Sequence, residues 1–178
     1  VVFQQPALYP WLNVEDNVKF GLKMRKISGK ETNRKVDFFL EKIGLDEFRK
    51  LKPYELSGGM KQRVAIARVL ANDPKVLLMD EPFGALDALT RIQMQKEILK
   101  IWEKEKTTMI LVTHDIDESI YLGDKIVIMS SRPGTIKKVL PVEIARPRDR
   151  NSPDFSLLRR QVFDEFFVEN SVVSDYVI

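Results

Sequence analysis

The sequence predicts an α/β fold in which a parallel sheet is joined to a mainly helical part. The helical part covers about residues 13–72, where apolar residues recur at helical spacing. Beyond it, three short apolar runs alternate with segments of helical pattern: Val76–Met79, Met109–Val112 and Lys125–Met129. Continuous apolar strands separated by helices are typical of a parallel sheet covered on both faces. We therefore expect these three runs to be strands of such a sheet.

Three helices are expected in the first part of the chain. Asn13 is suited to cap the first, whose apolar face carries residues 14, 18 and 22. Residues 36, 39, 40 and 43 form the apolar stripe of the second, and Gly44 is suited to end it. After an interruption at Pro53, Ser57–Gly59 opens the third helix, which is expected to run to about Ala71.

The last part of the chain is expected to hold a hairpin and one more helix. Pro133-Gly134 marks a turn into residues 135–140, which predicts a hairpin rather than another crossover. A helix is expected beyond Ala145, within residues 146–178. The basic run Arg146–Arg150 is interrupted by proline and aspartate and has no interleaved aromatic residues. We interpret this run as solvated surface and not as a nucleic-acid interface.

The composition excludes several kinds of site. Of the 178 residues, 44% are hydrophobic and 31% charged, with a formal net charge of +3. This balance is too apolar for a disordered chain and too weakly positive for a nucleic-acid-scale field. No cysteine and one histidine exclude a disulfide framework, a zinc-thiolate site, a cysteine nucleophile and a site with several histidines from one chain. No apolar run reaches the roughly 18–20 residues of a membrane span, and no signal segment opens the sequence, so we expect a cytosolic chain.

Two carboxylates and the histidine are expected to meet at one edge of the sheet. Asp80 and Glu81 directly follow the first apolar run, and His114 follows the second. Parallel strands share a direction, and ligands of such sheets bind beyond the carboxyl ends of the strands. This set is suited to holding Mg²⁺ at Asp80, activating a water at Glu81 and contacting a phosphate at His114. The alternative is that the acids cap helices and that the histidine is structural.

The start of the third helix is suited to binding an anion. Gly58 and Gly59 leave backbone N–H groups open at a helix N-terminus, and Ser57 adds a hydroxyl group. The alternative is an ordinary helix start with glycines, since three such residues alone are weak support for a phosphate site.

Five segments in order resemble the motifs of ATP-binding cassette (ABC) ATPases. They are the Q-loop at Phe3-Gln4, the signature at Leu56–Arg63, the Walker B strand at Val76–Glu81, the D-loop at Gly84–Asp87 and the switch histidine at His114. The resemblance covers residues 3 to about 115. It implies a P-loop NTPase core with a parallel sheet and a helical subdomain.

The resemblance implies a role for each motif residue toward ATP and Mg²⁺. Gln4 would contact the Mg²⁺ and the attacking water, Asp80 would support the Mg²⁺, and Glu81 would be the general base. His114 would contact the γ-phosphate. The remaining residues would act across a head-to-tail dimer of two ABC ATPase subunits, where they would meet the nucleotide of the other subunit or organise that subunit: Ser57, Gly58 and Gly59 of the signature, and Asp87 of the D-loop.

One motif of the family is not found. The pattern G-x-x-x-x-G-K-[ST] of the Walker A loop does not occur in the 178 residues, and Gly29-Lys30 lacks the first glycine and follows no strand. We therefore expect the N-terminal part of the core to be missing, so that residues 1–178 are a partial nucleotide-binding domain that is inactive alone. We also expect such a loop to be encoded upstream of Val1.

The resemblance also implies subdomains, partners and a location. The helical subdomain would span about residues 12–72, the rest of the RecA-like core about 73–145 and a C-terminal extension about 146–178. The Leu-x-Pro-Trp sequence at Leu8–Trp11, after the Q-loop, resembles importers of the nitrate, sulfonate and taurine type. Such a subunit, most simply a homodimer, lies on the inner face of the membrane beside permease subunits and acts with a solute-binding protein indirectly. Tyr9, Trp11 and Leu12 would line the permease groove, or Trp11 packs locally on the first helix.

Two other functions are compatible with part of this pattern. A non-catalytic ABC fragment or binding module would supply the signature face alone, but the pair of acids and the histidine argue against it. An ABC-type ATPase of DNA maintenance would carry a long coiled coil or a Cys-rich insert between its motifs. The short spacing between the signature and the Walker B strand and the lack of cysteine favour transport over this second alternative.

Overall fold

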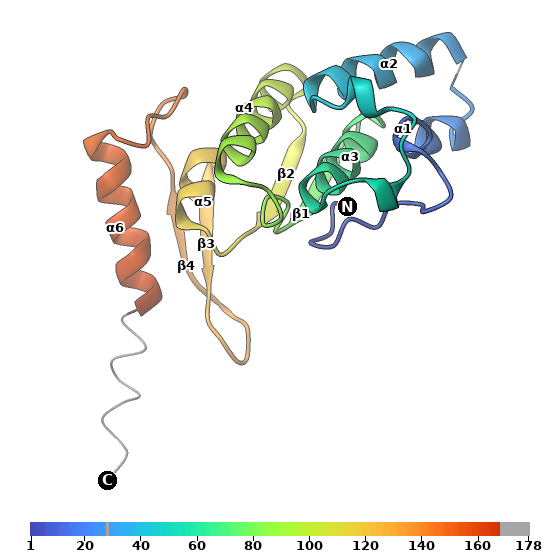
Figure 1. Ribbon diagram of the computed structural model, residues 1–178. Helices are drawn as coiled ribbons and strands as arrows, with labels where there is room; N and C mark the ends of the chain where they lie inside the picture. Colours follow the sequence, from blue (N-terminus) through green and yellow to red (C-terminus); the bar gives the residue numbers. More distant parts are fainter. Residues whose placement is uncertain (28, 168–178) are drawn as a thin grey trace. The chain divides into compact units, whose positions relative to one another are not determined.

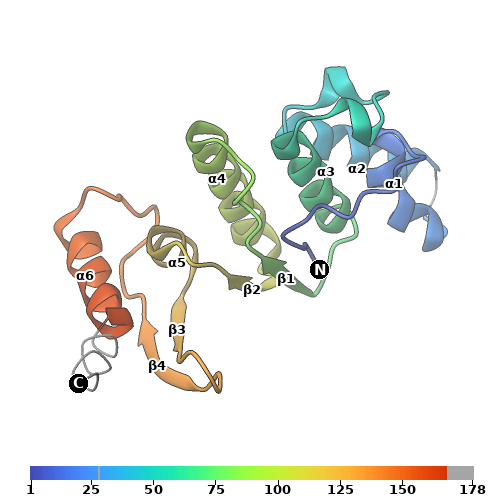
Figure 2. The ribbon, with the colours of Figure 1, turned by 60° about the horizontal axis from the view of Figure 1, so that its bottom comes forward.

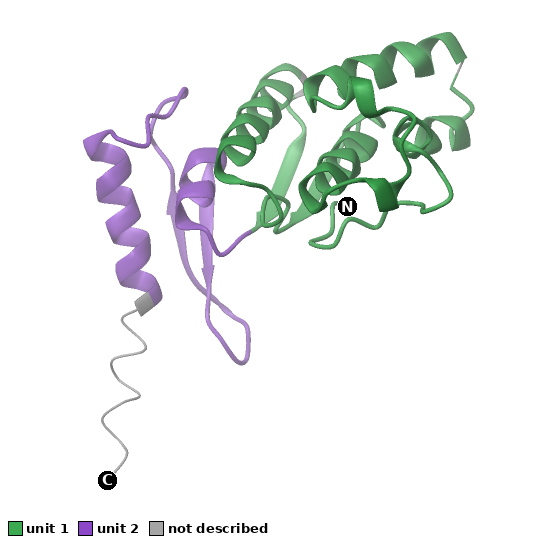
Figure 3. Cartoon of the chain, in the orientation of Figure 1, with its two compact units in different colours: residues 1–112 green, residues 113–178 purple. Residues whose placement is uncertain are grey.

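The computed structural model describes residues 1–27 and 29–167. The chain forms two compact units, Val1–Val112 and Thr113–Ile178, which Figure 3 shows in different colours. Each unit is described by itself below. Within the described residues, no helix is long and apolar enough to cross a membrane.

The first unit begins with three helices and two short turns of 3-10 helix between the second and the third. The bounds are α1 at Val14–Met24, α2 at Gly29–Lys42, η1 at Asp46–Phe48, η2 at Pro53–Glu55 and α3 at Gly58–Leu70 (Figure 1). The expected helix ends are confirmed, because the Asn13 side chain accepts a hydrogen bond from the Asp16 N–H at 2.7 Å and Gly44 adopts a φ of +64° just after α2.

The three helices lie side by side, as Figures 1 and 2 show, and their buried side chains form a small apolar core. Val18 and Leu22 from α1, Leu40 from α2 and Ile66 from α3 are fully buried. Asn17 is also fully buried, and its amide donates to the carbonyl groups of residues 9, 12 and 13. The amide therefore satisfies the backbone of the chain segment that enters α1.

Two parallel strands joined by one long helix complete the first unit. They are β1 at Val76–Asp80 and β2 at Thr108–Val112, paired from Val76↔Thr108 to Asp80↔Val112, with the crossover helix α4 at Ala88–Glu105. Val2 forms a parallel bridge with Met79, so the start of the chain lies beside β1. The expected parallel pairing of the first two apolar runs is confirmed.

The two faces of this sheet differ. Leu77 and Met79 are buried, whereas Val76, Leu78, Ile110 and Val112 lie on the other face and are 39–58% exposed. The expectation of a sheet covered on both faces is therefore wrong for the described residues. In an unbroken apolar run, the side chains on both faces of the strand are apolar. The run therefore does not show whether another segment covers each face of the sheet.

The second unit holds the expected hairpin between two helices. Its elements are α5 at Ile116–Leu122, β3 at Lys125–Met129, β4 at Ile136–Pro141 and α6 at Pro153–Phe167. β3 and β4 pair antiparallel, which confirms the hairpin. The run that was expected to be a third parallel strand thus has an antiparallel partner within its own unit.

The basic run of the second unit is less solvated than the sequence suggests. Arg148 is only 6% exposed, and its guanidinium group donates to five backbone carbonyl groups. Arg146 pairs with Asp124, and Arg150 stacks 3.7 Å from the centre of the Tyr121 ring. The interpretation as solvated surface is wrong for Arg148, because backbone carbonyl groups at the end of α5 and of residues 142 and 144 accept from its guanidinium group.

Glu15 of α1 is expected to make the first unit sensitive to acid. Burial raises the pKa of this carboxyl group, but hydrogen bonds from Lys19 and Lys50 outweigh that effect and lower the pKa from 4.5 to about 2. Because the folded-state pKa is below the unfolded value, the stabilisation is complete at neutral pH and is lost as the pH falls from about 5 to about 2. Glu15→Gln should lower the free energy of unfolding by about 2 kcal/mol at pH 7.

Urea unfolding at pH 7 and pH 3 checks this prediction. The difference in the free energy of unfolding between the native protein and Glu15→Gln should be clearly smaller at pH 3 than at pH 7. Glu47→Gln, at an exposed position, serves as the control and should change little at either pH. A Glu15→Gln deficit of the same size at both pH values would contradict the assignment.

Candidate active site

The first unit presents Asp80 and Glu81 at the carboxyl end of β1. Glu81 adopts a φ of +42°, which a residue other than glycine rarely does, and its N–H donates to the Val112 carbonyl group at 2.9 Å. The following residues, Pro82 and Phe83, are buried and anchor the turn. Backbone conformations of this kind cost of order 1–3 kcal/mol and cluster at functional sites. The turn thus fixes the Glu81 carboxylate at the sheet edge.

Gln4 reaches the same edge from the start of the chain. The Val2 N–H donates to the Leu78 carbonyl group at 2.8 Å, and the Asp80 N–H donates to the Val2 carbonyl group at 2.9 Å. Two residues later, the Gln4 Nε2 donates to Glu81 Oε2 at 3.3 Å. The structure therefore brings together the side chains of Gln4 and Glu81, which lie far apart in the sequence.

The donors at this edge suit Mg²⁺ better than a transition metal. The described residues contain no group of three or more His, Cys, Asp or Glu side chains that could hold a metal ion. The exposed Asp80 carboxylate and the Gln4 amide oxygen are hard oxygen donors of the kind that Mg²⁺ prefers. Mg²⁺ is commonly held by one or two carboxylates, with waters and substrate phosphates as its other ligands. The residues present fit such an ion.

The signature residues form the N-terminus of α3. Ser57 is the cap, and its hydroxyl group accepts from the Met60 N–H at 3.2 Å. A Cβ atom added at Gly58 would meet nothing within 4 Å, whereas one added at Gly59 would lie 3.3 Å from the Ala85 carbonyl oxygen. At Gly59 the D-loop backbone therefore approaches the helix closely and leaves little room for a side chain. Gly58 faces open space at a helix end that attracts anions.

The D-loop connects β1 to α4. Asp87 caps α4 by accepting from the Thr90 N–H at 3.0 Å, and hydrogen bonds from Thr90 lower the pKa of Asp87. Arg63 of α3 donates to the Ile43 carbonyl group at 2.7 Å. Burial lowers the pKa of Arg63, and the charge of Asp87 partly opposes that shift.

His114 belongs to the second unit, where it is exposed. It lies in a turn that Thr113 stabilises, because the Thr113 hydroxyl group donates to Glu118 at 2.9 Å and accepts from the Asp115 N–H at 3.0 Å. Asp115 caps α5 by accepting from the Glu118 N–H at 3.1 Å. The meeting of His114 with Asp80 and Glu81 stays a prediction.

A cluster of aromatic rings follows the Q-loop. The Tyr9 ring lies 5.6 Å from the Trp11 ring and 4.3 Å from the Phe20 ring, measured between centroids. Trp11 is nevertheless 67% exposed, so local packing leaves most of its surface accessible. Leu12 is half-buried beside it. This arrangement is suited to contact with a partner.

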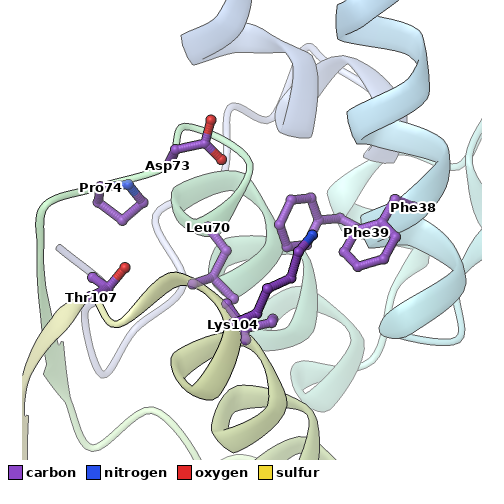
Figure 4. A pocket seen from close by; sticks show the side chains of 8 residues that line it. Phe38, Phe39, Leu70, Asp73, Pro74, Lys104 and Thr107 are labelled. Carbon is purple, nitrogen blue, oxygen red and sulfur yellow. The ribbon is translucent and has the colours of Figure 1, made fainter.

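A pocket elsewhere in the first unit is separate from these motifs. It measures about 50 Å³ and is mostly apolar, and Figure 4 shows its lining from α2, from the C-terminal end of α3 and from α4, including Phe38, Phe39, Leu70 and Lys104. None of the motif residues lines it, and a pocket of this size has no room for a nucleotide.

The sequence analysis missed Gln62. This residue lies on α3 in the apolar stripe that continues at Ile66, and both side chains are fully buried. The Gln62 amide donates to the Phe3 carbonyl group at 3.1 Å. A polar residue at a core-facing position of a helix is the signal that could have identified it.

Comparison with known proteins identifies the fold. An ATP-binding cassette, MJ0796, solved as a dimer in a post-hydrolysis state with ADP and Pi, matches with a TM-score of 0.73 at 34% identity, over 81% of this chain and 62% of that one. Residues 1–84 match the family described as ABC transporter. The chain has the fold of an ABC-type ATP-binding domain. The expected fold class is thereby confirmed.

Relatives of this ABC-type domain include transport proteins. An uncharacterized ABC transporter ATP-binding protein of Methanocaldococcus jannaschii is 51% identical over 164 residues, which is 92% of this chain. The aliphatic sulfonates import ATP-binding protein SsuB of Bacillus subtilis is 52% identical over 165 residues, which is 93% of this chain. The chain spans 61% and 64% of the lengths of these two relatives.

Proposed function

We propose that this chain acts in the ATP-hydrolysing subunit of an ABC importer that takes up a small solute of the sulfonate type. The observation that carries the proposal is the sheet edge, where the Gln4 amide contacts the carboxylate of Glu81 at the end of β1. The N-terminus of α3, where Gly59 lies close to the D-loop, is a second element of the same unit and attracts anions. The identity to SsuB proteins supports the importer class.

The residues at the sheet edge divide the chemistry between them. Glu81 takes the proton of the attacking water, and Gln4 orients that carboxylate and the water. Asp80 and the Gln4 amide oxygen would hold Mg²⁺, and this ion would neutralise the charge of the phosphate oxygens. His114 contacts the γ-phosphate. The Glu81–Gln4 hydrogen bond is compatible with this division, because it places the amide beside the carboxylate at the end of β1.

A second subunit completes each site. Ser57, Gly58 and Gly59 bind the γ-phosphate of ATP held by the facing subunit, through the N–H groups at the start of α3. Asp87 organises the facing subunit across the same interface. The open space at Gly58 supports this role, since a Cβ atom added there would meet nothing within 4 Å among the described residues. Two copies of the chain form the simplest such pair.

The 178 residues alone do not turn over ATP in this proposal. The chain contains no G-x-x-x-x-G-K-[ST] sequence, so it does not itself supply the lysine and the glycine loop that hold the β- and γ-phosphates. An ATPase assay on the 178-residue chain should therefore give no activity above a blank. Turnover by this chain alone would contradict the proposal.

The permease contact involves the aromatic residues after the Q-loop. Tyr9, Trp11 and Leu12 line a groove of the helical part, about residues 12–72, that receives a segment of the membrane subunit at the inner face of the membrane. The exposure of the Trp11 ring supports this assignment. The solute-binding protein then acts on this subunit only through the permease.

A reconstituted transporter tests the function. The product of the complete gene is assembled in vesicles with its permease and solute-binding protein, and ATP hydrolysis is measured with and without solute. An unsubstituted alkanesulfonate should raise the hydrolysis rate, and nitrate and taurine, each at the same concentration, test the other two solute types. No stimulation by any of these solutes would contradict the importer assignment.

A further inference from the structure

At the start of the chain, neighbouring residues are hydrogen-bonded to different elements, first to β1 and then to α3. The backbone of Val2 is hydrogen-bonded to β1, through the Leu78 carbonyl group and the Asp80 N–H. The carbonyl group of the next residue, Phe3, accepts instead from the Gln62 side chain of α3 at 3.1 Å. The chain is thus held by the sheet on one side of Phe3 and by the signature helix on the other.

Gln62 holds the peptide group that carries Gln4. The carbonyl group of Phe3 and the nitrogen of Gln4 belong to one planar unit, so a contact that fixes the first also fixes the second. Gln4 in turn donates to Glu81 Oε2 at 3.3 Å. A continuous path of contacts therefore runs from α3 through Gln62 and Gln4 to Glu81.

The same helix holds the segment at a second point. Arg68 donates to the Ala7 carbonyl group at 2.8 Å, and its guanidinium group lies 5.3 Å from the centre of the Tyr9 ring. Burial lowers the pKa of Arg68. The residues from Phe3 to Ala7 are therefore fixed to α3 at both ends.

The Gln62 amide is costly as a core residue. The side chain is fully buried, and Oε1 has no hydrogen-bond partner in the part of the chain that the structure describes. A buried polar atom without a partner destabilises the folded state, whereas an apolar side chain of similar shape would avoid this cost. What the amide makes possible, and an apolar side chain does not, is the hydrogen bond to the Phe3 carbonyl group.

We propose that Gln62 is a positioning residue that transmits the position of the signature helix to Gln4, and through Gln4 to Glu81. The proposal rests on the proposed ATP hydrolysis at Glu81. When phosphate binding at the N-terminus of α3 shifts that helix, the Phe3–Gln4 peptide group shifts with it. The Gln4 amide then sets the orientation of the Glu81 carboxylate. Hydrolysis at one subunit thus depends on the position of its own signature helix.

A double-mutant cycle on the product of the complete gene tests the proposal. Gln62→Leu should lower kcat for ATP hydrolysis by about tenfold, with KM changed less than twofold and no loss of thermal stability. In a Gln4→Ala background the same substitution should lower kcat by less than about twofold, because Gln62 acts through Gln4. Gln95→Leu, the same change at another buried glutamine of the first unit, is the control and should have equal effects in both backgrounds.

A spectroscopic measurement tests the contact without turnover. The backbone amide resonance of Gln4 should move on Gln62→Leu and stay in place on Gln95→Leu. An equal loss of kcat from Gln62→Leu in both backgrounds, or an unchanged kcat, would overturn the proposal. A native protein that does not hydrolyse ATP would overturn the proposed function and this role with it, and a Gln4 resonance that still moves would then show the contact to be structural alone.

Discussion

Glu81→Gln should abolish steady-state ATP hydrolysis by the product of the complete gene, with a loss of at least about 100-fold in kcat. A glutamine has nearly the same shape, and its Oε1 can still accept from the Gln4 Nε2, which donates to Glu81 at 3.3 Å in the native protein. The substitution therefore keeps the contact and removes only the group that can take a proton from water. ATP binding should be retained.

Phosphate release measured at saturating ATP checks this prediction. Glu41→Gln, the same change at an exposed position of α2, is the matched control and should hydrolyse ATP at the native rate. Unfolding midpoints of both variants should stay near the native value, because neither position is in the core. Undiminished hydrolysis by Glu81→Gln would remove Glu81 from the role of general base.

Arg148→Met should be the most destabilising of these substitutions, with a loss of about 3 kcal/mol in the free energy of unfolding of the second unit. The Arg148 guanidinium group donates to the carbonyl groups of residues 120, 121 and 123, at the C-terminal end of α5, and to those of residues 142 and 144. Helix-end carbonyl groups have no partner within their own helix. Methionine fills a similar volume and leaves these acceptors unpaired.

Burying the positive charge of Arg148 is unfavourable, but not enough to remove its proton at neutral pH. Burial, and to a lesser extent the neighbouring charge of Arg146, lower the pKa of Arg148 to about 10. The group is therefore still protonated at pH 7 and retains its donors. Urea unfolding at pH 7 checks the prediction, with Arg160→Met, at an exposed position of α6, as the control. Equal stability of the two variants would show that the carbonyl cluster contributes nothing.

The periodicity of the sequence predicted the elements well, but it did not predict which strand faces are covered. The caps at Asn13 and Gly44 and the parallel pair β1–β2 follow from local patterns, because helix ends and apolar strands are specified by a few neighbouring residues. The exposed face that includes Val76 and Ile110 does not follow, since the same apolar run fits a covered or an uncovered sheet.

The hydrogen-bond partners of two buried polar side chains were the second feature that the sequence did not predict. Arg148 lies in a charged run where arginine is usually exposed, and Gln62 lies in an apolar stripe that indicates burial but not the acceptor. In both cases the bonded backbone carbonyl group is far along the chain. The contact between Gln4 and Glu81 could have been predicted from the sequence. Gln4 follows the segment that pairs with β1, and Glu81 follows β1 itself, so both residues lie at the same sheet edge.

The central claim is that the signature residues of one subunit bind the nucleotide of the other, and the mass of the Glu81→Gln protein in solution tests it most directly. Light scattering should show that ATP with Mg²⁺ doubles this mass. Adding Gly58→Glu should prevent the doubling, because a carboxylate at the start of α3 repels the phosphate while its Cβ meets nothing within 4 Å in its own chain. Adding Gly29→Glu, at the first residue of α2 and equally open, should leave the doubling unchanged. A Gly58→Glu protein that still doubles its mass with ATP would contradict the account.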